Sequence, residues 1–212
     1  MSEPIDRRTR KRLATRQAIS DTATRLFWQR GFDAVTVDEI AQAADVGRMT
    51  VFNHFPRKED MFFDRDEEGR TMLRNALRQR DHDVAPIETL RLLAHRLVAE
   101  RTPYVDFSAE SQSFVGTIEG SETLKARARA IRDELAAVVE VALAESAGRD
   151  PGDPDARLAA ALLLATWATA FLEAHRIFRR TENSERAQAA FLAIVDRGTL
   201  GLKAAMAGTP YA

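Results

Sequence analysis

The segment 48–54 reads Arg-Met-Thr-Val-Phe-Asn-His and combines several side chains that can contact nucleobases. An arginine can donate two hydrogen bonds to guanine O6 and N7, and an asparagine can pair with adenine N6 and N7. A methionine or a threonine can touch a thymine methyl group. If the segment is helical with Val51 facing inward, its outward face consists of Arg48, Met49, Thr50, Asn53 and His54. The chemistry that this face favours is the reading of base edges.

The element that precedes this segment has a clear helix start signal. Thr36 and, three residues later, Glu39 form the pattern of a capping box, and apolar residues occupy the two positions of a hydrophobic staple. These signals predict a short helix over 37–44. The tripeptide 45–47, Asp-Val-Gly, then predicts a turn, because aspartate tolerates a positive φ and glycine can act as a helix N-cap.

The segment 48–54 is predicted to form a second short helix, which must end before Pro56 because the residue before a proline is pushed out of the α region. Upstream, apolar residues at helical spacing predict a longer helix over 9–30 that ends at Gly31 in a left-handed conformation. These dimensions are those of a helix-turn-helix, whose first short helix crosses the DNA backbone while the second lies in the major groove. The residues expected to face inward onto the long helix are Val37, Ile40, Ala41, Ala44, Val46, Val51 and Phe55.

Charge is concentrated at the N-terminus, although the whole chain has a formal net charge of only −1. The first 16 residues carry six basic and two acidic side chains, a local net charge of 6 − 2 = +4. This composition predicts a basic arm next to the helix-turn-helix, where it can contact phosphate.

The order and spacing of these residues resemble the DNA-binding domain of the tetracycline-repressor (TetR) family over about residues 10–62. The segments that carry the resemblance are 31–32, 36–41, 44–46 and 50–60. The resemblance implies a homodimeric, ligand-responsive transcriptional regulator, usually a repressor, whose C-terminal helical domain dimerises and binds a small molecule. Over the rest of the chain only the length and the helical character agree with the family.

The resemblance also implies roles for individual residues. Arg48 and Thr50 match base-reading positions, whereas His54 and Lys58 match positions that commonly bind the DNA backbone. Thr36 matches the start of the second helix, where a hydroxyl and free backbone N–H groups often hold a phosphate. The chain departs from the family pattern at three positions, because Phe52 replaces the usual tyrosine, Asp45 a frequent glycine, and Gly47 a frequent serine or threonine. A tyrosine contact with phosphate is therefore not expected.

Helical spacing continues to the C-terminus, and no sustained alternation predicts a strand. The further helices are expected over 57–80, 86–101, 103–115, 122–147, 154–180 and 185–207. The predicted fold is all-α: an N-terminal three-helix DNA-binding domain with its basic arm over 1–58, and a C-terminal helical bundle for effector binding and dimerisation over 59–212.

The segment 159–172 is apolar around nearly its whole circumference, so the helix that contains it must be covered on more than one side. Together with the last predicted helix, it suits a four-helix interface across the two-fold axis of a homodimer. Burial in the core of a single chain is the alternative.

Several large side chains of the C-terminal domain are candidates to line an effector pocket between helices. They are Leu73, Tyr104, Phe107, Phe114, Trp167, Phe171 and His175. Each of them also fits an ordinary core position. If the pocket exists, its residues favour an apolar or aromatic effector. The alternative is a DNA-binding regulator whose C-terminal domain binds a protein partner instead of a small molecule.

Enzyme function lacks its minimum parts in this sequence. The chain has no cysteine, no Glu-x-x-His pair, no H-E-x-x-H, no P-loop, no G-x-S-x-G and no G-x-G-x-x-G. We therefore expect no enzymatic activity, no metal and no cofactor. The charged N-terminus and the absence of an uninterrupted apolar run of about 18 residues predict a soluble, cytoplasmic protein that is not held in a membrane.

Overall fold

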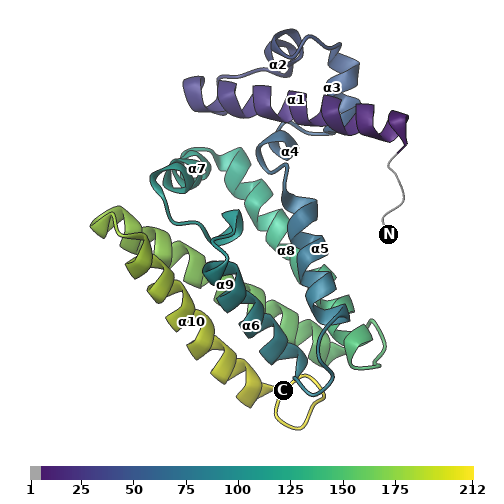
Figure 1. The fold of residues 1–212 in the computed structure, drawn as a ribbon, viewed down its shortest axis with the longest axis vertical. Coiled ribbons are helices and arrows are strands. Elements are labelled where there is room, and N and C mark those ends of the chain that lie inside the picture. The colour runs from purple at the N-terminus through teal and green to yellow at the C-terminus, as the bar shows by residue number, and fades with distance from the viewer. Residues whose placement is uncertain (1–5) are drawn as a thin grey trace. The chain divides into compact units, whose positions relative to one another are not determined.

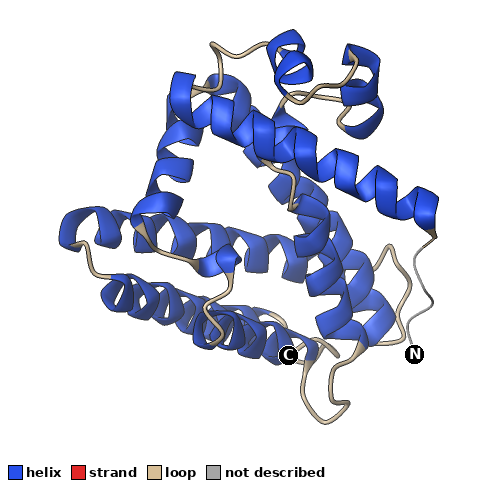
Figure 2. Cartoon of the chain, turned by 45° about the horizontal axis from the view of Figure 1, so that its top comes forward, coloured by secondary structure: helices blue, strands red, loops and turns tan. Residues whose placement is uncertain are grey.

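Helices make up all of the regular secondary structure in residues 6–212, the part of the chain that the computed structural model describes (Figure 2). The elements are α1 (Arg7–Arg30), α2 (Val37–Ala43), α3 (Arg48–His54), α4 (Glu59–Phe62), α5 (Asp66–Arg78), α6 (Pro86–Ala99), the 3₁₀ helix η1 (Pro103–Val105), α7 (Ala109–Gly120), α8 (Glu122–Ser146), α9 (Pro154–Thr181) and α10 (Ser184–Ala205). The predicted all-α fold is confirmed.

The chain divides into two compact units. The first, here called the head, contains residues 6–66 together with residues 117–127. The second, here called the body, contains residues 67–116 and 128–212. The head thus extends past the expected boundary after residue 58, and it includes the end of α7 and the start of α8, which the sequence assigned to the C-terminal domain.

The head is built around an aromatic cluster at the end of α1. The ring centroids of Phe27 and Phe32 lie 4.9 Å apart, and Phe62 of α4 lies 6.2 Å and 6.1 Å from them. Ile40 of α2 and Val51 of α3 are fully buried. α1 begins at Arg7, so the basic residues from there to position 16 lie on the first turns of a helix and not in an extended arm. The arm's first five residues lie outside the described part of the chain.

α9 and α10 run side by side in the body, and α6 packs against α10 (Figure 1). α9 begins with a proline in its first turn, and the side chain of Asp153 caps it by accepting a hydrogen bond from the N–H of Asp155 at 2.9 Å. The two helices approach each other closely at Gly198. A Cβ atom at this position would lie 2.2 Å from Cγ2 of Thr166, so the packing requires a residue without a side chain.

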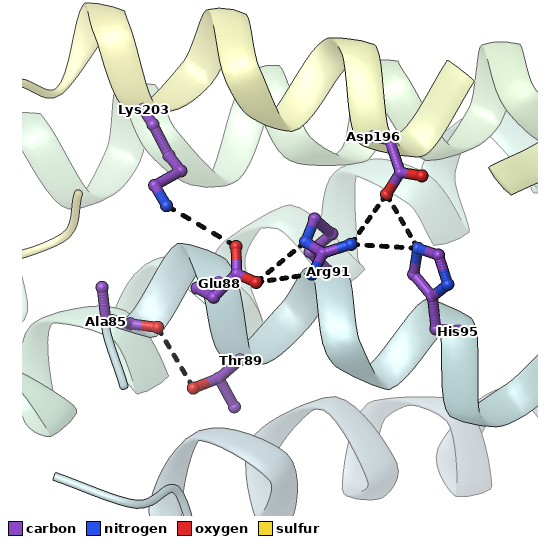
Figure 3. Close-up of polar contacts among 7 residues, drawn as sticks. All are labelled: Ala85, Glu88, Thr89, Arg91, His95, Asp196 and Lys203. Atoms are coloured by element: carbon purple, nitrogen blue, oxygen red, sulfur yellow. Dashed lines mark hydrogen bonds and ion pairs between the residues drawn. The ribbon is translucent and has the colours of Figure 1, made fainter. Parts of the chain in front are cut away.

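A polar cluster joins α6 to α10 (Figure 3). Arg91 donates to Oε1 of Glu88 at 2.7 Å and to Oδ1 of Asp196 at 3.0 Å. His95 Nε2 lies 2.7 Å from the same Asp196 oxygen and 3.1 Å from Nη1 of Arg91. Nζ of Lys203 on α10 lies 3.6 Å from Oε2 of Glu88 and also belongs to the cluster.

Two predicted helices are interrupted in the structure. The helix expected over 57–80 is divided into α4 and α5, because Met61 and Phe62 are buried and the backbone leaves the helical conformation at Phe63. The helix expected over 103–115 is divided into η1 and α7, because Phe107 turns into the core and is fully buried. Ser108 then caps α7, accepting a hydrogen bond from the N–H of Ser111.

The backbone at Gly31 also differs from expectation. Its φ is +82°, which favours glycine, but its ψ of 151° is not that of the left-handed helix. The N–H of Gly31 still bonds to the carbonyl of Phe27 at 2.8 Å and closes the last turn of α1.

Among the described residues, α9 is long and apolar enough to cross a membrane by length and composition. Within the body, part of its apolar surface is covered: Ala159, Ala160, Leu163 and Ala170 are buried. Other apolar side chains of the same helix remain exposed, among them Leu158, Leu162 and Leu172.

Candidate nucleic-acid interface

The start of α2 is fixed by the predicted capping box. Oγ1 of Thr36 accepts from the N–H of Glu39 at 3.3 Å, and Oε2 of Glu39 accepts from the N–H of Thr36 at 2.8 Å. Arg30 at the end of α1 forms an ion pair with the same carboxylate at 2.7 Å. The bond from Thr36, then the one from Arg30, hold the pKa of Glu39 at about 2. Glu39 therefore ties the start of α2 to the end of α1.

The turn between α2 and α3 is a Schellman motif centred on Asp45. The N–H of Val46 bonds to the carbonyl of Ala41 at 3.0 Å, and the N–H of Asp45 bonds to that of Gln42 at 3.2 Å. Asp45 has a φ of +52°, as expected for an aspartate in this turn. Gly47 follows as the N-cap of α3 without a side-chain hydrogen bond. This turn sets the direction in which α3 leaves α2.

α3 presents to solvent much of the face that the sequence assigned to base reading. Arg48 and Asn53 are exposed, and the side chain of Met49 is 69% exposed. Thr50 and His54 are half-buried. On the opposite side Val51 is fully buried, and Phe55, which follows the helix, is buried with it. Of the other residues expected to face inward, Ile40 and Ala41 are buried, and Val37, Ala44 and Val46 are half-buried.

Arg48 is not a free side chain in the head. Its Nη1 donates to Oδ2 of Asp38 on α2 at 2.9 Å, and its guanidinium lies 5.5 Å from the centre of the Phe52 ring. Both partners of the ion pair are well exposed, with 60% of the Arg48 side chain and 64% of the Asp38 side chain accessible. The arginine best placed for base contact is therefore held from α2 and from within α3.

The C-terminal end of α3 is held by α1. Arg16 Nη1 donates to the carbonyl of His54 at 2.6 Å, and its guanidinium lies 4.0 Å from the centre of the Phe55 ring. Burial, with a smaller contribution from Arg12 and Arg16, lowers the pKa of His54 below its ordinary value of 6.5. His54 is therefore a neutral side chain at pH 7 that gains charge only in more acidic solution.

Lys58 has a structural role within the head. Its ammonium group donates to the carbonyls of Phe32 and Val35, each at 2.9 Å, and lies 4.1 Å from the centre of the Phe32 ring. Partial burial lowers the pKa of the ammonium group. Two of its three N–H donors hold the connection between α1 and α2. The phosphate contact that the family resemblance implies for Lys58 stays a prediction.

The segment 117–127 is joined to the rest of the head by polar contacts that the sequence did not indicate. Ser121, which is buried, donates to Asp33 at 3.0 Å. Arg127 of α8 pairs with Asp60 at 3.1 Å and with Asp66 at 3.5 Å. These partners lie more than 50 residues apart in the chain, so no local sequence pattern predicts them.

In the body, four of the residues suggested for effector binding gather in one aromatic cluster. The Phe107 ring centroid lies 6.0 Å from that of Phe171 and 5.1 Å from that of His175. Phe191 of α10, which was not among the residues suggested for effector binding, lies 5.9 Å from Phe107 and 6.5 Å from Trp167. His175 is buried, and its Nδ1 lies 3.4 Å from Oε1 of Gln112.

The other three suggested residues lie on different elements. Leu73 of α5 is buried in the body's hydrophobic core. Tyr104 of η1 donates from its hydroxyl to Glu68 at 2.9 Å. Phe114 is a half-buried residue of α7.

Sequence reasoning missed Asp38 and Arg16, the two residues that hold α3 at its two ends. A search for opposite charges facing each other across the two short helices would have found Asp38. Arg16 could not be distinguished by sequence from the other basic residues of its segment.

A capped α2, a Schellman turn and an outward-facing α3 packed on a longer helix define a helix-turn-helix DNA-binding protein.

Residues 19–64 match the family model for bacterial regulatory proteins of the tetR family. The HTH-type transcriptional regulator YhgD of Bacillus subtilis (strain 168) is 26% identical over 146 residues, which cover 66% of this chain and 74% of YhgD. The HTH-type transcriptional regulator AcrR of Shigella flexneri is 48% identical over 48 residues, which cover 23% of this chain and 22% of AcrR.

Solved structures share the fold over most of the chain. A protein from Mesorhizobium loti MAFF303099, described as a TetR-family transcriptional regulator, has a TM-score of 0.57 at 20% identity. The alignment covers 92% of this chain and 97% of the Mesorhizobium loti chain. Thermus thermophilus FadR, in complex with lauroyl-CoA, has a TM-score of 0.53 at 24% identity, with coverages of 88% and 92%. SmeT in complex with triclosan has a TM-score of 0.55 at 19% identity, with coverages of 89% and 91%. Residues 19–64 are thus similar to the DNA-binding domain of the tetR family, and the solved structures show that the chain shares its fold with TetR-family regulators.

Proposed function

We propose that this protein is a ligand-responsive repressor that binds a palindromic operator as a homodimer, with α3 of each chain in the major groove. The observation that carries the proposal is the exposed face of α3, which follows the hydrogen-bonded Schellman turn. The residues proposed to contact DNA are Thr36, Arg48, Met49, Thr50, Asn53, His54 and Lys58. Arg48 and Asn53 suit guanine and adenine, and Met49 and Thr50 suit a thymine methyl group.

Phosphate contacts would come from the edges of the same surface. The first turns of α1 carry the concentrated positive charge, which attracts a duplex whatever its sequence. Lys58 keeps a third N–H donor beyond the two that bond to carbonyls. Thr36 already uses its hydroxyl and N–H within the capping box, so a phosphate there would have to share these groups with Glu39.

Dimerisation is proposed to use the exposed apolar side chains of α9 and α10. Leu158, Leu162 and Leu172 follow one another at helical spacing along α9, and the last of them is 57% exposed. Leu200 of α10 is 71% exposed. A second copy of the same two helices across a two-fold axis would cover these side chains, since one surface then serves both partners.

The effector is proposed to be an apolar or aromatic small molecule bound at the aromatic cluster of the body. Trp167 has a buried Nε1 atom without a hydrogen-bond partner, so an acceptor on the effector could satisfy it. The complexes of FadR with lauroyl-CoA and of SmeT with triclosan support an effector with a large apolar part. The full set of residues proposed to bind it is Leu73, Tyr104, Phe107, Phe114, Trp167, Phe171 and His175.

The proposed mechanism is a shift in population between two arrangements of the dimer. Two recognition helices must lie about 34 Å apart, one turn of DNA, to enter successive major grooves. An effector that binds better to a dimer with another spacing lowers DNA affinity by its differential affinity for the two states. Such a regulator would act in the cytoplasm and have no enzymatic activity.

DNA binding is tested by selection from a pool of random-sequence duplexes at low ionic strength. The proposal predicts enrichment of an inverted repeat, whereas recovery of unchanged random sequence would contradict it.

A thermal-shift screen with small lipophilic molecules tests effector binding, because a ligand that binds only the folded state raises the stability of that state. If no compound in a broad library raises the melting temperature, the second candidate function is favoured: a regulator whose body binds a protein partner. The exposed apolar side chains of α9 and α10 support this candidate, because a partner could cover them.

A further inference from the structure

The ion pair between Arg48 and Asp38 spans the helix-turn-helix. Asp38 lies in the first turn of α2 and Arg48 is the first residue of α3, so the pair joins the two short helices across their turn. The Phe52 ring, one turn further along α3, lies beside the guanidinium. Arg48 is therefore restrained in direction at the position from which a recognition helix contacts bases.

Folding stability does not account for this pair. Both side chains are more than half exposed, and exposed ion pairs contribute little because solvent screens them and ordering two long side chains costs entropy. The pair does, however, fix a side chain that otherwise samples many rotamers. Because the Arg48 side chain is already ordered in the free protein, less conformational entropy is lost when it binds DNA.

The geometry leaves one edge of the guanidinium available. Asp38 accepts from Nη1, and no other described residue bonds to Nε or Nη2 of Arg48. These two nitrogens form a planar fork of donors, which matches the paired acceptors O6 and N7 of guanine. The carboxylate also opposes any swing of Arg48 toward the DNA backbone, because an arginine on a phosphate would leave Asp38 beside negative charge without its partner.

We propose that Asp38 is a positioning residue for base recognition, which holds Arg48 so that its Nε and Nη2 fork faces a guanine in each half-site. Asp38 itself contacts no base. This inference rests on the proposed function, because it assumes that α3 enters the major groove.

The test compares base preference between variants. The unchanged protein, Asp38→Ala and Asp45→Asn are each used to select from the same pool of random-sequence duplexes. Asp45→Asn is the matched control, since it also removes one negative charge next to α3, has no ion pair with Arg48, and keeps a residue that tolerates a positive φ. Affinities are then measured for the selected duplex and for versions with each base pair changed.

We expect Asp38→Ala to lower the preference for guanine at one position of each half-site by about tenfold, the scale of one bidentate contact. Preferences at the other positions should not change. Asp45→Asn should alter the affinity for all sequences alike. In Arg48→Ala, adding Asp38→Ala should have no further effect on base preference, because the residue through which Asp38 acts is gone.

Melting curves followed by circular dichroism separate positioning from folding. If Asp38→Ala does not fold, Asp38→Asn replaces it; its amide oxygen keeps the hydrogen bond but not the charge, and we expect a smaller loss of guanine preference. If the unchanged protein enriches an inverted repeat and the Asp38 variants keep the same base preference, this inference is wrong and the proposed function stands. If the unchanged protein enriches no sequence, both are overturned.

Discussion

Arg48, His54 and Lys58 are three basic residues within one short segment, and the structure uses each differently. Arg48 faces solvent and is held by Asp38. His54 lies at the end of α3 with a lowered pKa. Lys58 donates to two backbone carbonyls inside the head. A charge pattern alone could not distinguish these roles, because they depend on which partner each side chain meets after folding.

Replacing Lys58 by methionine keeps most of the apolar stem and removes the ammonium group. The carbonyls of Phe32 and Val35 then lose their donor, so we expect the stability of the head to fall by about 2 kcal/mol. Urea denaturation followed by circular dichroism measures this change. If Lys58 also contacts phosphate, the salt dependence of DNA binding falls by about one unit of slope. Unchanged stability would show that the two bonds are dispensable.

The lowered pKa of His54 leads us to expect that DNA binding depends on pH. Because its pKa is lowered below 6.5, the imidazole is neutral at pH 7 and becomes charged only as the solution is made more acidic. A charged His54 beside a phosphate should raise affinity for a duplex between about pH 7 and pH 5. In His54→Gln we expect a smaller rise over this interval, measured by fluorescence anisotropy. An equal rise in both proteins would remove His54 from the interface.

The same pKa shift has the opposite effect on folding. A histidine whose pKa is lower in the folded state binds fewer protons there, so stability decreases as the pH falls through the unfolded value of about 6.5. Melting curves at each pH must therefore accompany the anisotropy measurements, and only conditions in which both proteins are folded should be compared.

At the scale of the elements, local signals predicted some boundaries well. The capping box at Thr36 and the positive φ of Asp45 are confirmed, because both depend on hydrogen bonds and sterics within a few residues. The breaks near Phe63 and Phe107 were missed. Neither has a proline or glycine at the break, and each arises where tertiary packing draws an aromatic side chain into a core.

The contact between α9 and α10 at Gly198 gives a test of helix packing. Alanine normally stabilises a helix relative to glycine, by about 1 kcal/mol. In Gly198→Ala we expect instead a loss of about 1 to 3 kcal/mol, because the new methyl group overlaps the side chain of Thr166. Thermal unfolding measures the change, and Thr166→Ala in the same chain should recover part of it.

Gly116 of α7 is the matched control, since a Cβ atom there meets nothing within 4 Å. Gly116→Ala should leave stability unchanged or raise it. A gain in stability from Gly198→Ala would mean that the two helices do not approach as closely as the structure has them.

At the scale of the whole molecule, binding to both halves of a palindrome requires a dimer. We expect Leu172→Glu to give a monomer in sedimentation experiments, because it places a charge within the proposed apolar interface. Affinity for the palindrome should then fall about 100-fold or more, since the second head no longer binds as part of the same particle.

Leu92 of α6 offers a control of similar exposure, at 45% compared with 57% for Leu172. Leu92→Glu should remain dimeric and bind DNA normally. If Leu172→Glu also remains dimeric, the interface lies elsewhere on the chain.

The sequence predicted much of the outward face of α3, but it did not predict which aromatic side chains of the body gather together. A helix-turn-helix is short and its signals are local, so residue types and spacing are enough to orient Arg48 and Asn53. The aromatic cluster around Phe107 depends on contacts between α10 and segments far away in the chain. The helical spacing of Phe191 indicates an apolar helix face, but it does not show that Phe107 is its neighbour.

The central claim is that two α3 helices enter successive major grooves of one operator. Methylation of guanine N7, an atom of the major groove, tests this most directly on the selected duplex with and without protein. We expect two protected patches on one face of the DNA, centred about 34 to 36 Å apart, with two chains bound per duplex. A single protected patch, or protection confined to the minor groove, would contradict the claim.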